Sequence, residues 1–123
     1  MKLEFPVLRH AWQGLVHVVK TQRHARWHAL ASLAVVGLGI GLQVSRIEWL
    51  ALMLAIGLVW VAEIFNTALE IACDVISKDP HPLIGLAKDV AAGAVLVAAF
   101  TAAAVGAVVF VPRLWEMWGL GCE

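Results

Sequence analysis

The chain has 123 residues, enough for one small domain, and it is 62% hydrophobic but only 15% charged. Water-soluble globular proteins are far less apolar, so this composition predicts a membrane protein. The formal net charge is zero, which leaves no basic footprint for a nucleic acid, and no such partner is expected. The two cysteines, Cys73 and Cys122, lack CxxC spacing, so neither a zinc site nor a disulfide framework is predicted.

The N-terminal segment, residues 5–27, mixes apolar and basic side chains in a pattern typical of an amphipathic helix at a membrane surface. The apolar residues fall roughly on one side of such a helix and the basic residues on the other. A cytoplasmic helix packed on its own protein would give the same pattern, and this alternative stays open. The apolar residues are Trp12, Leu15, Val16, Val18 and Val19, and the basic ones include Arg9, His17, Lys20, Arg23 and Arg26.

Three transmembrane helices are predicted after this segment, at 29–45, 47–76 and 87–112. The first is close to the lower limit of about 17 residues for crossing the hydrocarbon. Its GxxxG pair, Gly37 and Gly41, allows a close approach of another helix. The second is longer than one crossing, so its C-terminal part should leave the membrane. The third is rich in Ala, Val and Gly, which suits a crowded bundle or an oligomer interface.

Two linkers join these spans. A polar turn is predicted at 43–48, and a loop at 77–86, SKDPHPLIGL, where two prolines and a glycine are expected to break the helix. The positive-inside rule places the N-terminus and the second linker in the cytoplasm and the C-terminus outside. Lys2, Arg9, Lys20, Arg23 and Arg26 precede the first span, Lys78 and Lys88 lie at the second linker, and only Arg46 and Arg113 fall on the other side.

The second span carries the most informative stretch, AEIFNTALEIACD. Glu63, Asn66, Glu70 and Asp74 recur at helical spacing in this stretch and line one face. An acid at the bilayer centre costs roughly 3 kcal/mol on insertion scales, so such residues indicate a function. Counted from Trp49, Glu63 should lie just inside the hydrocarbon edge, while Glu70 and Asp74 emerge into the headgroup layer.

Further polar residues are expected at the same membrane edge, and together they have the chemistry of phosphoryl transfer to a lipid hydroxyl. Carboxylates bind Mg²⁺ together with phosphate oxygens. A lysine neutralises phosphate charge, and a carboxylate at the position of Glu63 suits a general base. No GxxxxGK[ST] segment or kinase-type glycine loop is present. The additional residues are Asp79, His81, Lys88 and Asp89.

Two other classes stay open on the residues alone. A small membrane assembly protein would use these polar groups to pair with one another. A proton or ion pathway would also place acids inside the membrane. The run from Leu50 to Val61 is apolar throughout, which disfavours a continuous pathway.

The residues AEIFNTALEIACD and HPLIGLAKDVAAGAVLVAA closely resemble the motif of the bacterial integral-membrane diacylglycerol kinase / undecaprenol kinase family. The resemblance extends over nearly the whole chain and implies one lipid kinase domain, residues 1–123. It also implies an all-α homotrimer of three-span subunits, each with a surface helix, and active sites shared between neighbouring subunits. The expected activity is phosphorylation of a membrane lipid alcohol by ATP with Mg²⁺ in the bacterial inner membrane, on the cytoplasmic side. The segment HPLIGLAKDVAAGAVL favours undecaprenol as the substrate, with diacylglycerol as the runner-up.

The resemblance also implies roles for individual residues. Glu63 is the expected general base, Glu70 the expected Mg²⁺ ligand, and Asn66 a polar residue that supports Glu70. Nucleotide contacts are implied for Lys88 and Asp89, with Lys88 toward the phosphates. Asp74 and His81 are implied as further residues of the nucleotide pocket.

One position departs from the family pattern. The family often has a glutamate after the surface helix as a second metal ligand, and Gln22 stands there in this chain. An amide oxygen can still coordinate Mg²⁺ but contributes no charge. Nearby, Arg26 and His28 fit the RxH pattern of the undecaprenol kinase branch.

Simpler explanations stay open for four of these residues. Asp89 would be favoured in the first turn of any helix by the helix dipole, and Lys88 would serve as a positive-inside anchor. His81 would be a solvated loop residue, and Asp74 would pair locally with Lys78 at i, i+4.

Overall fold

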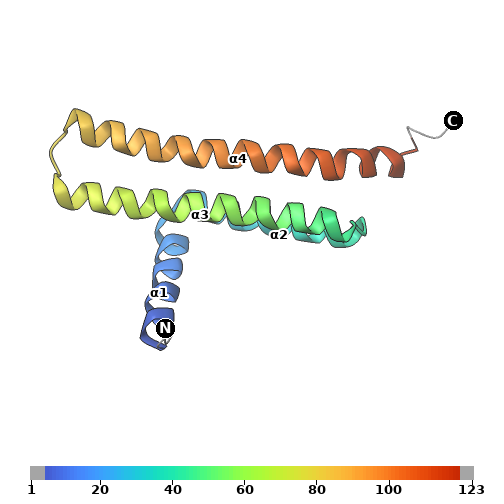
Figure 1. The fold of residues 1–123 in the computed structure, drawn as a ribbon, viewed down its shortest axis with the longest axis horizontal. Helices are drawn as coiled ribbons and strands as arrows, with labels where there is room; N and C mark the ends of the chain where they lie inside the picture. The colour runs from blue at the N-terminus through green and yellow to red at the C-terminus, as the bar shows by residue number, and fades with distance from the viewer. Residues whose placement is uncertain (1–4, 120–123) are drawn as a thin grey trace.

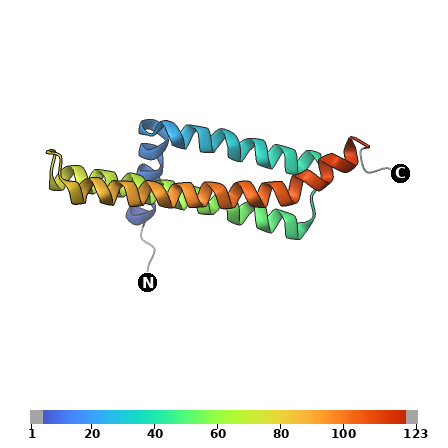
Figure 2. The same cartoon turned by 90° about the horizontal axis from the view of Figure 1, so that it is seen from above.

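The structure is a computed structural model that describes residues 5–119, and every regular element in that range is a helix. The four helices are α1 (Phe5–Thr21), α2 (Arg23–Gly41), α3 (Arg46–Ile76) and α4 (Pro82–Met117). Figures 1 and 2 show that α3 and α4 form a long antiparallel hairpin, that α2 runs alongside it, and that α1 crosses the other helices. The all-helical prediction is therefore confirmed. Cys122 lies outside the described residues.

The hairpin has two ends, which we name from their connections. The turn end is formed by residues 42–45 between α2 and α3, and the loop end by residues 77–81 between α3 and α4. A small apolar core lies near the turn end. Its fully buried members are Val44, Leu52, Val109 and Phe110.

Gly39 of α2 lies in tight contact with the Trp49 ring of α3 beside this core. A Cβ atom on Gly39 would lie 2.7 Å from Cη2 of Trp49, which is too close for any real side chain. The two glycines of the GxxxG pair, Gly37 and Gly41, have nothing within 4 Å of such an atom. Within the chain, the close approach of α2 and α3 therefore depends on Gly39 and not on the two glycines of the GxxxG pair.

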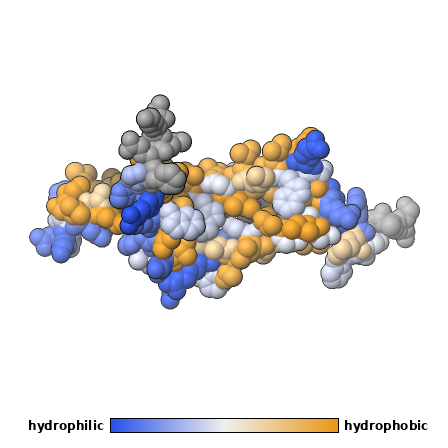
Figure 3. All heavy atoms as spheres, turned by 90° about the horizontal axis from the view of Figure 1, so that it is seen from below, coloured by the Kyte–Doolittle hydropathy of each residue, from blue (hydrophilic) through white to orange (hydrophobic). Residues whose placement is uncertain are grey.

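Two of the helices, α3 and α4, are long and apolar enough to cross a membrane by length and composition. α2 is not among the helices that pass this criterion in the described part of the chain, so its predicted span is not confirmed. On the face seen in Figure 3, apolar side chains cover much of the surface, while hydrophilic ones gather near its two ends and near α1. Such a surface is suited to contact with lipid tails.

The helix expected over 5–27 is instead divided at Gln22. The backbone of this residue is extended, with φ −101° and ψ 118°, so α1 ends before it and α2 begins after it. Arg26 explains why the break is stable. Its Nη2 donates to the Lys20 carbonyl at 2.9 Å and its Nε to the Val19 carbonyl at 3.4 Å. These contacts satisfy carbonyls at the end of α1 that the helix itself leaves unpaired.

The loop predicted over 77–86 is shorter than expected, because α4 already begins at Pro82. A proline at the first helical position has no N–H to leave unsatisfied, and its fixed φ suits a helix. The Nδ1 atom of His81 completes this start by accepting from the Leu83 N–H at 3.1 Å. Pro82 therefore starts a helix here, and the prediction that it breaks one is wrong.

α4 also continues past its predicted end at 112 and runs to Met117. Pro112 lies inside the helix, where it removes one backbone hydrogen bond. In Figure 2 the C-terminal part of α4, drawn in red, bends away from the line of the helix. A proline inside a helix is a usual cause of such a bend.

Candidate functional site

The polar face of α3 begins with Glu63, whose buried carboxylate lies beside α2. Glu63 is only 2% exposed, and its Oε2 atom lies 3.5 Å from Nε2 of His28 in α2. One turn further on, Thr67 is also buried, and its hydroxyl donates to the Glu63 backbone carbonyl at 3.0 Å. The hydroxyl of Thr67 is thus satisfied locally, and the described neighbour of the Glu63 carboxylate is the His28 imidazole.

Asn66 and Glu70 form a second polar pair on the same helix. Nδ2 of Asn66 donates to Oε1 of Glu70 at 3.4 Å. The other amide atom, Oδ1 of Asn66, is buried without a hydrogen-bond partner. A buried acceptor of this kind is costly unless something else satisfies it.

These two residues fit a magnesium ion. Mg²⁺ prefers one or two carboxylates, further oxygen ligands and substrate phosphates over a cage made only of protein side chains. Glu70 has the carboxylate, and the unpartnered oxygen of Asn66 lies beside it. No cluster of three or more His, Cys, Asp or Glu side chains suited to a metal occurs in residues 5–119. The donor set present therefore suits a metal that arrives with phosphate groups.

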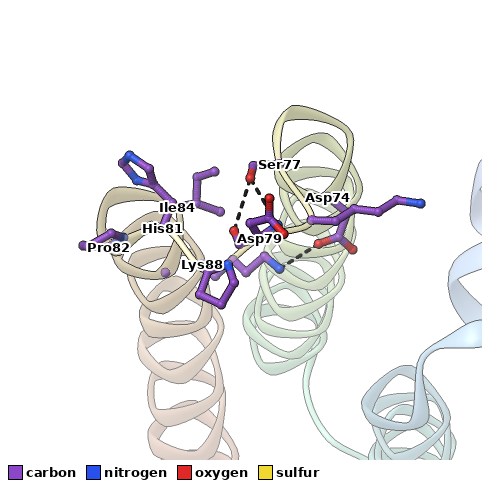
Figure 4. Close-up of a pocket in the computed structure, with 10 residues that line it drawn as sticks. Asp74, Ser77, Asp79, His81, Pro82, Ile84 and Lys88 are labelled. Carbon is purple, nitrogen blue, oxygen red and sulfur yellow. Dashed lines mark hydrogen bonds and ion pairs between the residues drawn. The ribbon is translucent and has the colours of Figure 1, made fainter.

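The loop end of the hairpin contains an open hollow of about 480 Å³. Its walls come from the end of α3, the loop and the first turns of α4 (Figure 4). Nζ of Lys88 reaches across from α4 to Oδ1 of Asp74 at 2.7 Å. The loop is held by Ser77, whose hydroxyl accepts from the Asp79 N–H at 3.2 Å. Asp74, Asp79, His81 and Lys88 all line the hollow.

The partner of Asp74 differs from the local alternative considered above. Asp74 pairs with Lys88, fourteen residues away, instead of with Lys78 one turn along the chain. The hairpin explains this choice, because it brings the first turns of α4 beside the last turns of α3. His81 likewise has a structural task, since one of its ring nitrogens caps α4.

Most of the predicted site residues consequently lie in three groups along the hairpin: Glu63, the pair Asn66 and Glu70, and the residues around the hollow at the loop end. Asp74 lies eleven residues beyond Glu63, about 16 Å along a helix at 1.5 Å per residue. Asn66 and Glu70 lie between these two positions. Gln22 is half-buried at the junction of α1 and α2, and Asp89 is exposed on α4. Within the described residues, neither side chain forms a hydrogen bond or ion pair with the other predicted site residues.

α1 packs against α3 at the level of Glu63. An apolar hollow of about 460 Å³ separates the two helices, and Trp60 and Ile64 of α3 line it. Of the apolar residues predicted on one side of α1, Val18 is buried against the protein, while Trp12 stays 68% exposed. The apolar face of α1 is therefore partly packed against the protein and partly exposed. The α1 residues that line the hollow are Trp12, Leu15, Val16, Val18, Val19 and Lys20.

The contact between His28 and Glu63 was missed from the sequence. His28 was noted only as part of the RxH pattern, with no partner assigned. The sequence contains one signal for it, a titratable side chain one residue before the predicted start of an otherwise apolar helix. Such a residue needs a partner when it is buried.

Comparisons with known proteins find relatives over most of the chain. Residues 9–110 match the family model described as prokaryotic diacylglycerol kinase. The undecaprenol kinase of Bacillus subtilis is 40% identical over 105 residues, which cover 85% of this chain and 85% of that protein. The diacylglycerol kinase of Synechocystis sp. is 39% identical over 110 residues, 89% of this chain but 63% of the relative. The diacylglycerol kinase of Escherichia coli is 31% identical over 110 residues, 89% of this chain and 87% of the relative.

Proposed function

The chain belongs to the family of prokaryotic diacylglycerol kinases and is a lipid kinase, and we propose that it transfers the γ-phosphoryl group of ATP, with Mg²⁺, to the hydroxyl of undecaprenol. The 40% identity with an undecaprenol kinase, over most of both chains, supports this substrate. Diacylglycerol is the second candidate, because relatives named for it match at 39% and 31%. Because the chain is a lipid kinase, this function is preferred to the two alternatives that the residues alone left open, an assembly protein and a proton or ion pathway.

Glu63 is the general base of the proposed reaction, and its burial is the observation that carries this assignment. The carboxylate is enclosed, lies at the level of α1, and has no cationic lysine or arginine paired with it in the described structure. In this position it accepts the proton of the lipid hydroxyl while the hydroxyl oxygen attacks the γ-phosphorus. The O–H bond breaks, and a new bond forms between the hydroxyl oxygen and the γ-phosphorus. The bond between the γ-phosphorus and the β,γ-bridging oxygen breaks, and ADP leaves with its electrons.

Glu70 and Asn66 are the residues proposed to hold Mg²⁺, which when bound neutralises charge on the phosphates. Gln22 is proposed as a further oxygen ligand. Lys88 contacts the phosphates, because its ammonium group stands in the hollow at the loop end and retains free donors beyond its contact with Asp74. Asp74, His81 and Asp89 complete the proposed nucleotide site.

The proposed enzyme is a homotrimer with α2 as a third transmembrane helix, and neighbouring subunits share each active site. The small side chains of α4 would permit close packing of subunits. The N-terminus and the loop end face the cytoplasm of the bacterial inner membrane, in line with the distribution of positive charge.

Phosphate transfer by the purified protein in mixed micelles tests this function. Undecaprenol and diacylglycerol are offered separately with ATP and Mg²⁺, and Glu63→Gln and Glu70→Gln are measured beside the wild type. We expect Glu63→Gln to lower kcat by about 10²–10⁴-fold, the usual contribution of a positioned general base. Glu116→Gln, an exposed change at the other end of α4, is the matched control and should retain activity.

Comparison of the two lipids tests which of them is the substrate. Preference for undecaprenol supports the proposed substrate, and preference for diacylglycerol replaces it with the second candidate. Folded wild-type protein that phosphorylates neither lipid would contradict the proposed function. Ion flux into liposomes without ATP would favour the pathway alternative instead.

A further inference from the structure

A general base that is closed off from water must still release its proton after every turnover. The side chain of Glu63 is only 3% exposed, so bulk water has little direct access to its carboxylate. Once the carboxylate has accepted a proton from the lipid, it is neutral and cannot act again. The site therefore needs a second group that receives this proton and has contact with water.

His28 meets both requirements. Its Nε2 atom lies 3.5 Å from Oε2 of Glu63. Its side chain is 22% exposed in the single chain, against 3% for Glu63, and it stands one residue before the predicted first span, on the side where water is reached. Distances in catalytic pairs are often long before substrate binds and shorten in the complex. An imidazole is also the side chain best suited to take up and release protons near neutral pH.

The hollow that His28 lines contains no other ionisable side chain among the described residues. The hollow that His28 lines between α2, α3 and α4 has otherwise only apolar residues and Ser32 as its walls. α4 contributes alanines, a glycine and a phenylalanine to this hollow, and α3 contributes Ile56 and Val59. Among the described residues, Glu63 is the one acid within ion-pair distance of His28.

A neighbouring contact holds the imidazole in this position. Ser32, one turn after His28 in α2, donates its hydroxyl to the His28 backbone carbonyl at 2.7 Å. The same hydroxyl accepts from Nε1 of Trp60 in α3 at 3.1 Å. Trp60 lies one turn before Glu63, so two contacts one turn apart join α2 to α3. This arrangement sets the register of His28 against Glu63.

We propose that His28 is a proton relay between Glu63 and water, an inference that rests on the proposed function of Glu63. After phosphoryl transfer, the proton on the Glu63 carboxyl passes to Nε2 of neutral His28. The carboxylate is regenerated and the imidazole becomes imidazolium. The imidazolium then releases one proton to water, and exchange of the remaining ring proton with water returns the neutral ring to the tautomer whose Nε2 is free to accept again. The net product is the proton lost by the lipid hydroxyl.

Steady-state kinetics of His28→Ala and His28→Gln, with and without added imidazole, test the relay. We expect both variants to lower kcat by roughly tenfold or more with little change in KM for ATP or lipid, because proton removal follows binding. Imidazole should raise the kcat of His28→Ala in proportion to its concentration, since it can occupy the vacated space and carry the proton. His28→Gln fills that space with a polar group that carries no proton, so it should respond weakly.

Structural effects are separated by a second variant. Ser32→Ala removes the contact with Trp60 without removing the imidazole, and any loss that it causes should not be recovered by added imidazole. If His28→Ala fails to fold, the kcat of His28→Gln decides the question, because this change keeps size and polarity.

The outcomes distinguish the relay from the underlying function. Wild-type kcat in His28→Gln, or a folded His28→Ala that imidazole does not rescue, would overturn the relay while the kinase function stands. Absence of phosphate transfer by the wild type in the same assay would overturn the proposed function and the relay together. Rescue by imidazole in His28→Ala, with none in Glu63→Gln, supports both.

Discussion

Both ends of the α3–α4 hairpin join an acid of α3 to a base of α4, but the two ion pairs differ in how fully their hydrogen bonds are used. At the turn end, Nε of Arg113 donates to Oε2 of Glu48 at 3.0 Å, and Nη2 donates to the other carboxylate oxygen. Nη1 also donates to the Leu42 carbonyl at 3.3 Å. Glu48 in turn accepts from the N–H of Ser45 at 3.0 Å and so caps α3.

At the loop end, one contact replaces this network. The ammonium of Lys88 meets Asp74 at 2.7 Å, and the two side chains are 39% and 64% exposed. An ammonium has three donors, and only one of them has a partner in the described residues. At the turn end most donors of Arg113 have partners, and they join α3 and α4 to the end of α2. The loop end keeps donors available for a ligand. A membrane kinase needs both properties, a fixed scaffold and an unsatisfied site.

Of the changes that separate the two ends, the largest effect is expected from removing the Lys88 ammonium at the loop end. Lys88→Met should lower kcat/KM for ATP by about tenfold or more, because a charge-assisted contact with phosphate is lost. Thermal stability should change little, since a single exposed pair contributes little to folding. The measurement is the ATP dependence of phosphate transfer, with a thermal melt of the same sample.

Lys78→Met is the matched control for this prediction. Lys78 lines the same hollow but has no ion pair in the described structure, and its loss removes the same charge. An equal loss of activity in both variants would mean that only the overall charge of the loop end matters. The contrast between the two ends would then lose its functional meaning.

The reverse pattern is expected at the turn end. Arg113→Met removes the contacts with Glu48 and with the backbone of the turn, so the melting temperature in detergent should fall by several degrees. The kcat of the protein that remains folded should stay near the wild-type value. Melting temperature and kcat measured on one preparation check both statements, and a lower kcat in fully folded protein would place Arg113 in the function.

A smaller loss of stability is expected from Gly39→Ala at the same end. The new Cβ atom would lie 2.7 Å from the ring of Trp49, and overpacking of this kind typically costs about 1–3 kcal/mol. Gly37→Ala has open space in the chain and serves as its control. Unfolding free energies of the two variants compare them directly. A larger loss for Gly37→Ala would show that its face is packed against another subunit.

Part of this contrast was predictable from the sequence. The period of the polar residues in α3 predicts one polar face, because side chains three and four positions apart share a side of a helix. The long apolar runs predict the hairpin helices for the same kind of local reason. Proline was ambiguous at the sequence level. Pro82 starts a helix and Pro112 is tolerated inside one, although a proline at either place can also end a helix.

The ion pairs themselves were not predictable. Glu48 and Arg113 are 65 residues apart, and Asp74 and Lys88 are fourteen apart across the loop. Pairing at such separations depends on how the hairpin aligns its helices, which periodicity within one helix does not determine. The roles assigned to the site residues come from the family resemblance and stay predictions.

The smallest effect is expected from Gln22→Glu, which tests whether the loop-end half of the molecule lacks a metal ligand. Gln22 stands at the break between α1 and α2, and its side chain makes no capping hydrogen bond there. A carboxylate in its place adds negative charge to the proposed Mg²⁺ site without removing a described contact. We expect the Mg²⁺ concentration for half-maximal activity to fall a few-fold, because carboxylates bind this ion better than amides do. Magnesium titrations of wild type and variant measure the shift, and an unchanged midpoint would exclude Gln22 from the metal site and leave Glu70 and Asn66 as its proposed ligands.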